Sequence, residues 1–256
     1  EKMIFKKAKN LKIYAVLIII LSYLYMRPND VFKKENLIGP GKPYATPFYI
    51  IESKLPGPVI CIIGGTHGNE PAGYRTAEKL LQFKPDYGKL IIIPRANIRA
   101  VRRNWREIPE EGDLNRCYPG NKTGSIMERL AFELLNFMKK EKIDLLIDLH
   151  ESLDYYVTDK YYLGQTVIAY ENEKSIWIAG MAIERINTKI KREKEQFSLL
   201  KNPIRGSTAW AGGKYLKIPA FSIETCKKLS LASRTNYMCQ LVGYILEEVG
   251  VKLICN

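Results

Sequence analysis

Histidine and cysteine are scarce in this 256-residue sequence, which contains two histidines and five cysteines. No two cysteines are spaced as a CxxC pair and their number is odd, so the sequence argues against a disulfide scaffold and against a cysteine-based structural zinc site. Internal repeats and low-complexity tracts are also lacking. At 46% hydrophobic and 26% charged residues, the composition is that of a globular protein and excludes disordered and collagen-like classes.

Acidic residues are outnumbered, since 27 Asp and Glu face 40 Lys and Arg and leave a formal net charge of +13. Residues 1–45 contribute +6 of this excess, from nine basic and three acidic residues. This distribution favours an anionic wall or membrane surface as a partner. Nucleic-acid binding is not expected, because the basic runs at 139–142 and 189–194 are mixed in sign and lack an accompanying aromatic stacking motif.

The N-terminal arm has the layout of a membrane-targeting segment. Five lysines precede an uncharged run of 14 residues at 13–26, and Arg27 and Pro28 close it. A signal-peptide core needs about 7–15 apolar residues and a spanning helix about 17–25; no A-x-A-like cleavage site follows the run. We predict an uncleaved single-pass membrane anchor at 1–27 and a linker at 28–46, with the rest of the chain extracytoplasmic. Secretion after cleavage and a buried core helix are the alternatives.

Apolar runs alternate with helical periodicity from residue 47 to the end of the sequence. A long polar segment at 94–124 interrupts this alternation, and Ser125 with Glu128 forms a capping box. The pattern predicts an α/β fold for 47–256, with a mixed, largely parallel central sheet and helices on both faces. The predicted strands are 58–64, 89–93, 144–149 and 219–223, and the predicted helices are 71–83, 125–140, 173–193 and 230–249.

Both histidines lie at the carboxyl ends of predicted buried strands, where open α/β sheets bind their ligands. His67 and Glu70 have an H-x-x-E spacing just past the strand at 58–64, and His150 follows 144–149. Two imidazoles and one carboxylate leave the fourth position of tetrahedral zinc open, as in a catalytic site. Isolated polar residues are the alternative interpretation, but it would have to hold for both histidines at matching positions. We predict one Zn²⁺ held by these three side chains.

Three further polar residues are candidates for catalysis or substrate binding. Glu224 ends another predicted strand, where a carboxylate can act as general base for a zinc-activated water. The alternative interpretation is that Glu224 is an ordinary acidic residue that faces solvent at the end of a strand. Asn115 and Arg116 lie in the long polar segment, where they can form a fork for a carboxylate.

Four motifs in order resemble the zinc carboxypeptidase clan, and most closely its succinylglutamate desuccinylase/aspartoacylase-like branch: HGNE at 67–70, DLNRCYPG at 113–120, DLHES at 148–152 and SIET at 222–225. The resemblance covers about residues 47–249. It implies the zinc ligands named above, with Glu224 as general base and acid. It also implies that Asn115 and Arg116 hold the substrate's free carboxylate, and that Asp113 orients one zinc-binding histidine.

The resemblance also implies an arginine upstream of DLNR that polarises the scissile carbonyl. Arg106 fits its R-x-x-P context best, and Arg103 is the alternative. Cys117 follows Arg116 and either lines the site or is a small buried hydrophobe. The family's active-site tyrosine has no unique counterpart, and the candidates are Tyr155, Tyr156, Tyr161, Tyr162 and Tyr215.

These inferences predict a membrane-anchored zinc hydrolase that cleaves an amide bond next to a free carboxylate. Desuccinylases and aspartoacylases of the family carry a further β-rich domain that narrows the pocket, whereas this sequence ends at Asn256, soon after Glu224. An open cleft is therefore expected, suited to a carboxypeptidase acting on peptides such as cell-wall stem peptides. The alternatives are a deacylase of N-acyl amino acids and a non-catalytic peptide- or wall-binding module with a relict zinc site.

Overall fold

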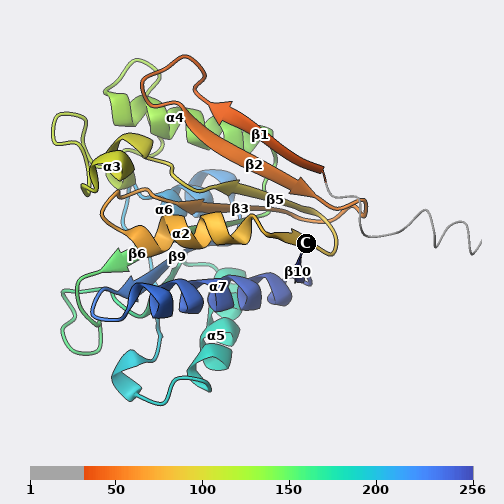
Figure 1. Cartoon of the computed structure of the whole chain (residues 1–256), viewed down its shortest axis with the longest axis vertical. Coiled ribbons are helices and arrows are strands. Elements are labelled where there is room, and N and C mark those ends of the chain that lie inside the picture. The colour runs from red at the N-terminus through yellow and green to blue at the C-terminus, as the bar shows by residue number, and fades with distance from the viewer. Residues whose placement is uncertain (1–31, 256) are drawn as a thin grey trace, which may run out of the picture.

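The computed structural model describes residues 32–255, in which a mixed eight-stranded sheet separates two layers of helices (Figure 1). The strands of this sheet are β1 (Phe32–Ile38), β2 (Thr46–Glu52), β3 (Val59–Gly64), β5 (Lys89–Ile93), β6 (Leu145–Ser152), β7 (Thr166–Ala169), β8 (Ser198–Lys201) and β9 (Ala220–Cys226). A separate two-stranded sheet contains β4 (Phe83–Pro85) and β10 (Leu253–Cys255).

Helices connect the strands and cover both faces of the sheet. The α-helices are α2 (Pro71–Leu80), α3 (Ile98–Arg103), α4 (Ile126–Lys140), α5 (Glu173–Asn187), α6 (Thr208–Ala211) and α7 (Leu231–Glu248). Two short 3₁₀ helices, η1 (Leu114–Arg116) and η2 (Glu193–Glu195), and a π-helical turn η3 (Gly212–Leu216) complete the elements.

The strand order is β1-β2-β5-β3-β6-β9-β7-β8. The four central strands, β5, β3, β6 and β9, are parallel to one another. Antiparallel strands extend both sides, because β2 pairs antiparallel with β5 and β7 pairs antiparallel with β9. The predicted mixed, largely parallel sheet is thus confirmed.

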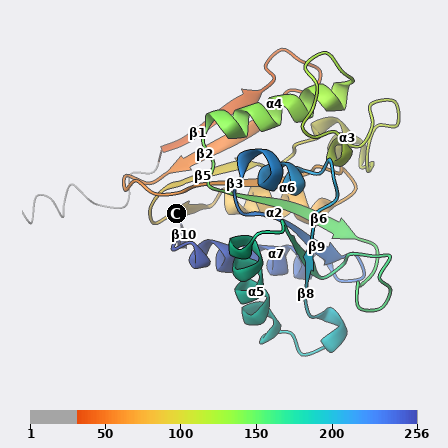
Figure 2. The ribbon, with the colours of Figure 1, turned by 180° about the vertical axis from the view of Figure 1, so that it is seen from behind.

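Alternate residues of the central strands enter two separate cores. Ile60 and Ile62 of β3 face the core under α2, α5 and α7, whereas Cys61 and Ile63 face the core under α4 and α6. Figures 1 and 2 show the two helical layers on opposite sides of the sheet. Because both faces are covered, the central strands are near-continuous apolar runs, which is why the sequence reveals them.

The four predicted strands and four predicted helices are confirmed, with shifts at their ends. Helix α2 stops at Leu80, and Phe83, predicted as helical, begins strand β4. Helix α5 ends at Asn187, six residues before the predicted end at 193. The capping box of α4 is present, since Ser125 accepts from the Glu128 amide and the Glu128 side chain accepts from the Ser125 amide.

The predicted linker at 28–46 needs correction in its described part. Residues 32–38 form β1, which pairs antiparallel with β2 along its whole length and so extends the sheet. The glycines and prolines at 39–43 that suggested a linker form the turn between β1 and β2, and the lysines within β1 suit an edge strand. The predicted anchor at 1–27 lies outside the described residues. Between residues 32 and 255, no helix combines the length and the apolar character needed to cross a bilayer.

The close approach of α2 to the sheet provides a stability test. A Cβ added at Gly73 in α2 would lie 2.4 Å from the carbonyl oxygen of Leu149 in β6, whereas one added at Gly243 in α7 has no neighbour within 4 Å. We expect Gly73→Ala to lower the free energy of unfolding by about 1–3 kcal/mol through overpacking. Gly243→Ala should instead raise it by about 0.5–1 kcal/mol. Urea denaturation of both variants measures this, and equal effects would contradict the packing described.

Candidate active site

The predicted site residues meet at the carboxyl ends of the parallel strands. The loop that follows β3 carries His67 and Glu70, and β6 carries His150. In the register of the sheet, His150 of β6 lies directly opposite Glu224 of β9. Gly65 turns the chain out of β3 with a φ of +67°, a conformation that disfavours other residues. The strand order therefore places all four side chains at one edge.

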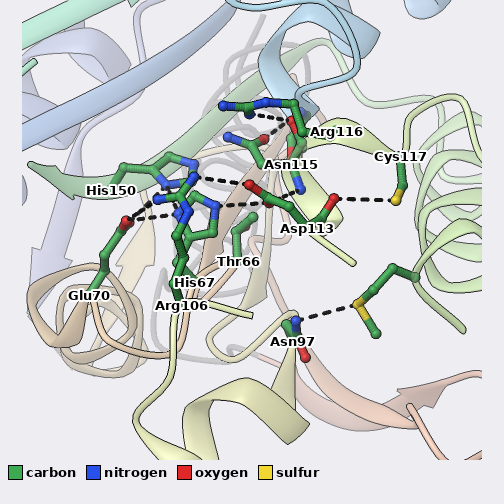
Figure 3. A network of polar contacts seen from close by, with 12 residues as sticks. Thr66, His67, Glu70, Asn97, Arg106, Asp113, Asn115, Arg116, Cys117 and His150 are labelled. Carbon is green, nitrogen blue, oxygen red and sulfur yellow. Dashed lines mark hydrogen bonds and ion pairs between the residues drawn. The ribbon is translucent and has the colours of Figure 1, made fainter. Parts of the chain in front are cut away.

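The side chains of His67, Glu70 and His150 form a buried cluster whose potential ligand atoms all lie within 4.8 Å of one another (Figure 3). The Nδ1 atom of His67 is 2.8 Å from Glu70 Oε1, and the Nδ1 atom of His150 is 2.9 Å from Glu70 Oε2. The two Nδ1 atoms are 3.3 Å apart. The predicted trio is thus brought together.

The opposite ring nitrogens of the two histidines each face a carboxylate. His67 Nε2 lies 3.1 Å from Asp113 Oδ1, and His150 Nε2 lies 2.9 Å from Asp148 Oδ2. Asp148 is fully buried, and its other oxygen accepts a hydrogen bond from Thr66. Carboxylates in these places favour the proton on Nε2, which leaves the Nδ1 lone pairs directed at Glu70.

This arrangement fits a metal ion. With both protons on Nε2, two nitrogen lone pairs and a carboxylate converge on one buried point, and these acceptors repel one another unless a cation lies between them. Two imidazoles and one carboxylate are a ligand set of catalytic zinc sites. The neighbouring carboxylates also change the pKa of the histidines. Burial lowers the pKa of His150, but Asp148 and Glu70 outweigh this and hold it well above its usual value, so protons compete with a metal.

Glu70 is a carboxylate kept ionised in a buried place. Burial by itself raises its pKa, yet the neighbouring His67 and His150 hold that pKa well below its usual range. The backbone amide of Glu151 donates to its Oε2 atom over 3.1 Å, and Arg106 Nη1 lies 3.4 Å from its Oε1 atom. Glu70 is therefore charged and fixed in orientation.

Glu224 has the environment of a proton acceptor that works near neutral pH. Its side chain is buried, and burial raises its pKa to about 7, with the charge of Glu70 acting in the same direction and the charge of His150 opposing it. It lines the same cleft as His67 and Glu70. A carboxylate with a pKa close to the working pH is suited to general acid–base catalysis.

A cleft of about 610 Å³ opens in front of these side chains. Arg116 lines it, donates from Nη1 to the Asn115 carbonyl oxygen over 2.8 Å, and has no carboxylate partner among residues 32–255. Asn115 is held in turn, since its Oδ1 atom accepts from the Thr208 amide. The other lining residues are His67, Glu70, Arg106, Glu151, Ser152, Tyr156, Lys160, Leu163, Ile168, Leu200, Lys201, Asn202, Pro203, Ile204, Ser207, Ser222 and Glu224.

The structure distinguishes between the two candidate arginines. Arg106 Nη2 is 3.0 Å from Asp113 Oδ2, and the Arg106 side chain lines the cleft beside Glu70 (Figure 3). Arg103 lies at the end of α3, where its side chain is exposed and donates to the Arg99 carbonyl oxygen. Arg106 is therefore the arginine that the fold brings to the cluster.

Among the five candidate tyrosines, Tyr156 lines the cleft, and the ammonium of Lys160 lies 3.7 Å from its ring centroid. Tyr155 is buried, and Tyr161 is 85% exposed. Cys117 is half-buried and packs against the core under α4, and its thiol donates to the Asp113 carbonyl oxygen.

Asp148 and Glu151 belong to the site but were not among the predicted site residues. Asp148 was detectable, because it lies two residues before His150 on the same face of β6.

We expect Asp148→Asn to weaken zinc binding by about 10–100-fold, since the carboxylate that faces His150 Nε2 is lost while all three ligands remain. Competition with a chromophoric chelator measures the zinc dissociation constant. Asp144→Asn, an exposed position just before β6, is the control and should bind zinc as the wild type does. Equal affinity of both variants would contradict the role of Asp148.

Comparisons with known proteins agree with this geometry. Residues 56–156, which include the first three motifs but not SIET, match the model of the Succinylglutamate desuccinylase/Aspartoacylase catalytic domain. Over 98 residues the chain is 34% identical to N-alpha-acetyl-L-2,4-diaminobutyric acid deacetylase from Halomonas elongata; this covers 37% of the chain and 28% of that protein.

Two solved structures share the fold. The mDAP-bound form of Csd4, a D,L-carboxypeptidase from Helicobacter pylori, superposes with a TM-score of 0.72 at 22% identity over 79% of this chain and 55% of that one. A succinylglutamate desuccinylase from a Silicibacter species gives a TM-score of 0.62 at 20% identity over 81% and 61%. The chain thus spans less than two thirds of each of these relatives. The resemblance predicted from the motifs is confirmed: this chain is similar to the succinylglutamate desuccinylase/aspartoacylase family, with its catalytic-domain match at residues 56–156.

Proposed function

We propose that this protein is a zinc-dependent hydrolase that cleaves an amide bond next to a free carboxylate, and that it acts as a carboxypeptidase on peptides such as cell-wall stem peptides. The observation that carries the proposal is that the cluster of His67, Glu70 and His150 reaches, through His67 and Glu70, the cleft that Glu224 and Arg116 also line. A metal site, a proton acceptor and a group that binds the substrate's carboxylate are the parts that such a hydrolysis needs.

The side chains have distinct roles in the reaction. Zinc, when held by the cluster, supplies Lewis acidity that polarises a carbonyl and makes water easier to deprotonate. Glu224 accepts a proton from the attacking water and returns it to the leaving amine, which its buried position and pKa of about 7 support. Arg106 brings a positive charge to the edge of the cluster, where negative charge develops on the carbonyl oxygen.

The position of the substrate along the cleft would be set by Arg116. Arg116 presents a guanidinium without a carboxylate partner in the described chain, and its fork geometry suits a carboxylate. Lys160 and Lys201 add positive charge to the same walls. A substrate with a free carboxylate near the scissile amide is therefore favoured over a neutral one.

A deacylase of N-acyl amino acids is the second candidate. The similarity to a deacetylase and the match to the Succinylglutamate desuccinylase/Aspartoacylase catalytic domain favour it, and the chemistry at the cluster would be the same. The two candidates differ in the length of substrate on the acyl side of the scissile bond.

We also propose that residues 1–27 anchor the protein in the cell membrane and that the catalytic part is extracytoplasmic. The basic residues before the uncharged run at 13–26 support this orientation. Such a location would bring the cleft to the wall peptides.

The full chain should be incubated with muropeptides and with N-acyl amino acids, with and without chelator, and the products identified by mass. Loss of a carboxyl-terminal residue from peptides, abolished by chelator and restored by zinc, is the result expected for a carboxypeptidase. Turnover of acyl amino acids alone would decide for the deacylase. A zinc-loaded protein that turns over neither class would contradict both.

Glu224→Gln should reduce kcat by at least about 100-fold, because the amide cannot accept the proton. Zinc stoichiometry and the dissociation constant for a substrate should change little, since Glu224 is not among the proposed ligands. Single-turnover kinetics and metal analysis check both parts. An unchanged kcat would contradict the role of Glu224, whereas absence of turnover in the zinc-loaded wild type would favour the non-catalytic module.

Arg106→Met should lower kcat by about 10²–10³-fold through the loss of charge stabilisation in the transition state. Arg103→Met is the matched control and should leave kcat unchanged, because Arg103 lies on α3 with its side chain exposed. Steady-state kinetics of the two variants separate the outcomes. Equal losses, or a loss in Arg103→Met alone, would exclude the proposed role of Arg106.

A further inference from the structure

Helix α2 begins with an unusual N-cap. Glu70 occupies that position, but its side chain makes no capping hydrogen bond, because both of its oxygens face the two histidines. Pro71 at the first helical position has no amide hydrogen, and the first turn contains no acidic residue. The first amide hydrogen that needs an acceptor from outside the helix is that of Ala72.

Glu151 supplies this acceptor from another element. Its side chain, which follows the alternation of Ile147 and Leu149 towards the layer of α2 and α7, accepts from the Ala72 amide over 2.9 Å. Its backbone amide donates to Glu70 Oε2 over 3.1 Å. One residue of β6 therefore holds both the start of α2 and the carboxylate that precedes it. A negative charge is also favourable at the positive end of a helix.

Arg234 neutralises this buried charge. It lies in the first turns of α7, and its Nη1 atom forms an ion pair with Glu151 Oε1. The Glu151 side chain is fully buried and that of Arg234 is 11% exposed, so little solvent screens the pair. Without the guanidinium, the Glu151 carboxylate would lie uncompensated at the buried start of α2.

We propose that Glu151 and Arg234 are positioning residues for the metal site: Glu151 caps α2 in place of Glu70, which leaves the Glu70 carboxylate free to bind the ion, and Arg234 fixes Glu151 in that place. The proposal rests on the metal site described above. The ion pair between α7 and β6 is then part of what orients the ligand at the start of α2.

The test compares Glu151→Met and Arg234→Met with two controls, Glu78→Met and Arg95→Met. Glu78, in the second half of α2, forms a partly exposed ion pair with Arg95 of the loop that follows β5. We expect the zinc dissociation constant, measured by chelator competition, to rise about 10–100-fold in the first two variants and less than twofold in the controls. Arg234→Lys keeps the charge and should restore most of the affinity.

A second readout does not require metal. In the zinc-free protein, hydrogen exchange at the Ala72 amide should accelerate at least about tenfold in Glu151→Met. Glu151→Gln, which keeps an acceptor, should preserve this protection. If Glu151→Met fails to fold, Arg234→Met takes its place, and unchanged zinc affinity in folded Arg234→Met would then contradict the proposal. Zinc affinity and Ala72 exchange unchanged in folded Glu151→Met would overturn the proposal. If the wild-type protein binds no zinc, the proposed function is refuted instead. The hydrogen-exchange measurement at Ala72 then still decides whether Glu151 caps α2.

Discussion

The parallel pairing of β3 with β6 and of β6 with β9 brings the candidate site together. Parallel strands end at one edge of the sheet, and here that edge receives His67 and Glu70 from the loop after β3, His150 from β6 and Glu224 from β9. The apolar layers on both faces hold the three strands in register. A slip of one residue in β6 would turn His150 away from Glu70.

That edge concentrates groups that would not stay together by themselves. Two nitrogen lone pairs and a carboxylate converge on one buried point, and the carboxylates of Asp113 and Asp148 lie at the opposite ring nitrogens of the two histidines. In the metal-free cluster the neighbouring carboxylates outweigh burial and raise the pKa of both histidines, so protons relieve the repulsion. A metal ion would take the place of those protons, and metal binding and protonation therefore compete at this point.

Much of the fold was predictable because its central strands are covered on both faces. Residues 58–64 and 144–149 are apolar runs for that reason, and they coincide with β3 and the first part of β6. The strands towards the edges of the sheet gave no such signal. Strands β7 and β8 have four residues each, too few for periodicity, and β1 mixes lysine with apolar residues as solvent-facing edge strands do.

His67, Glu70, His150 and Glu224 could be recognised from the amino-acid order, because the two histidines, the H-x-x-E spacing and the strand ends are local features. Folding in three dimensions was needed to show that Arg106 rather than Arg103 reaches the cluster and that Glu151 joins α7 to the start of α2. These contacts join segments far apart in the chain or depend on the direction of a side chain, and no local pattern encodes either.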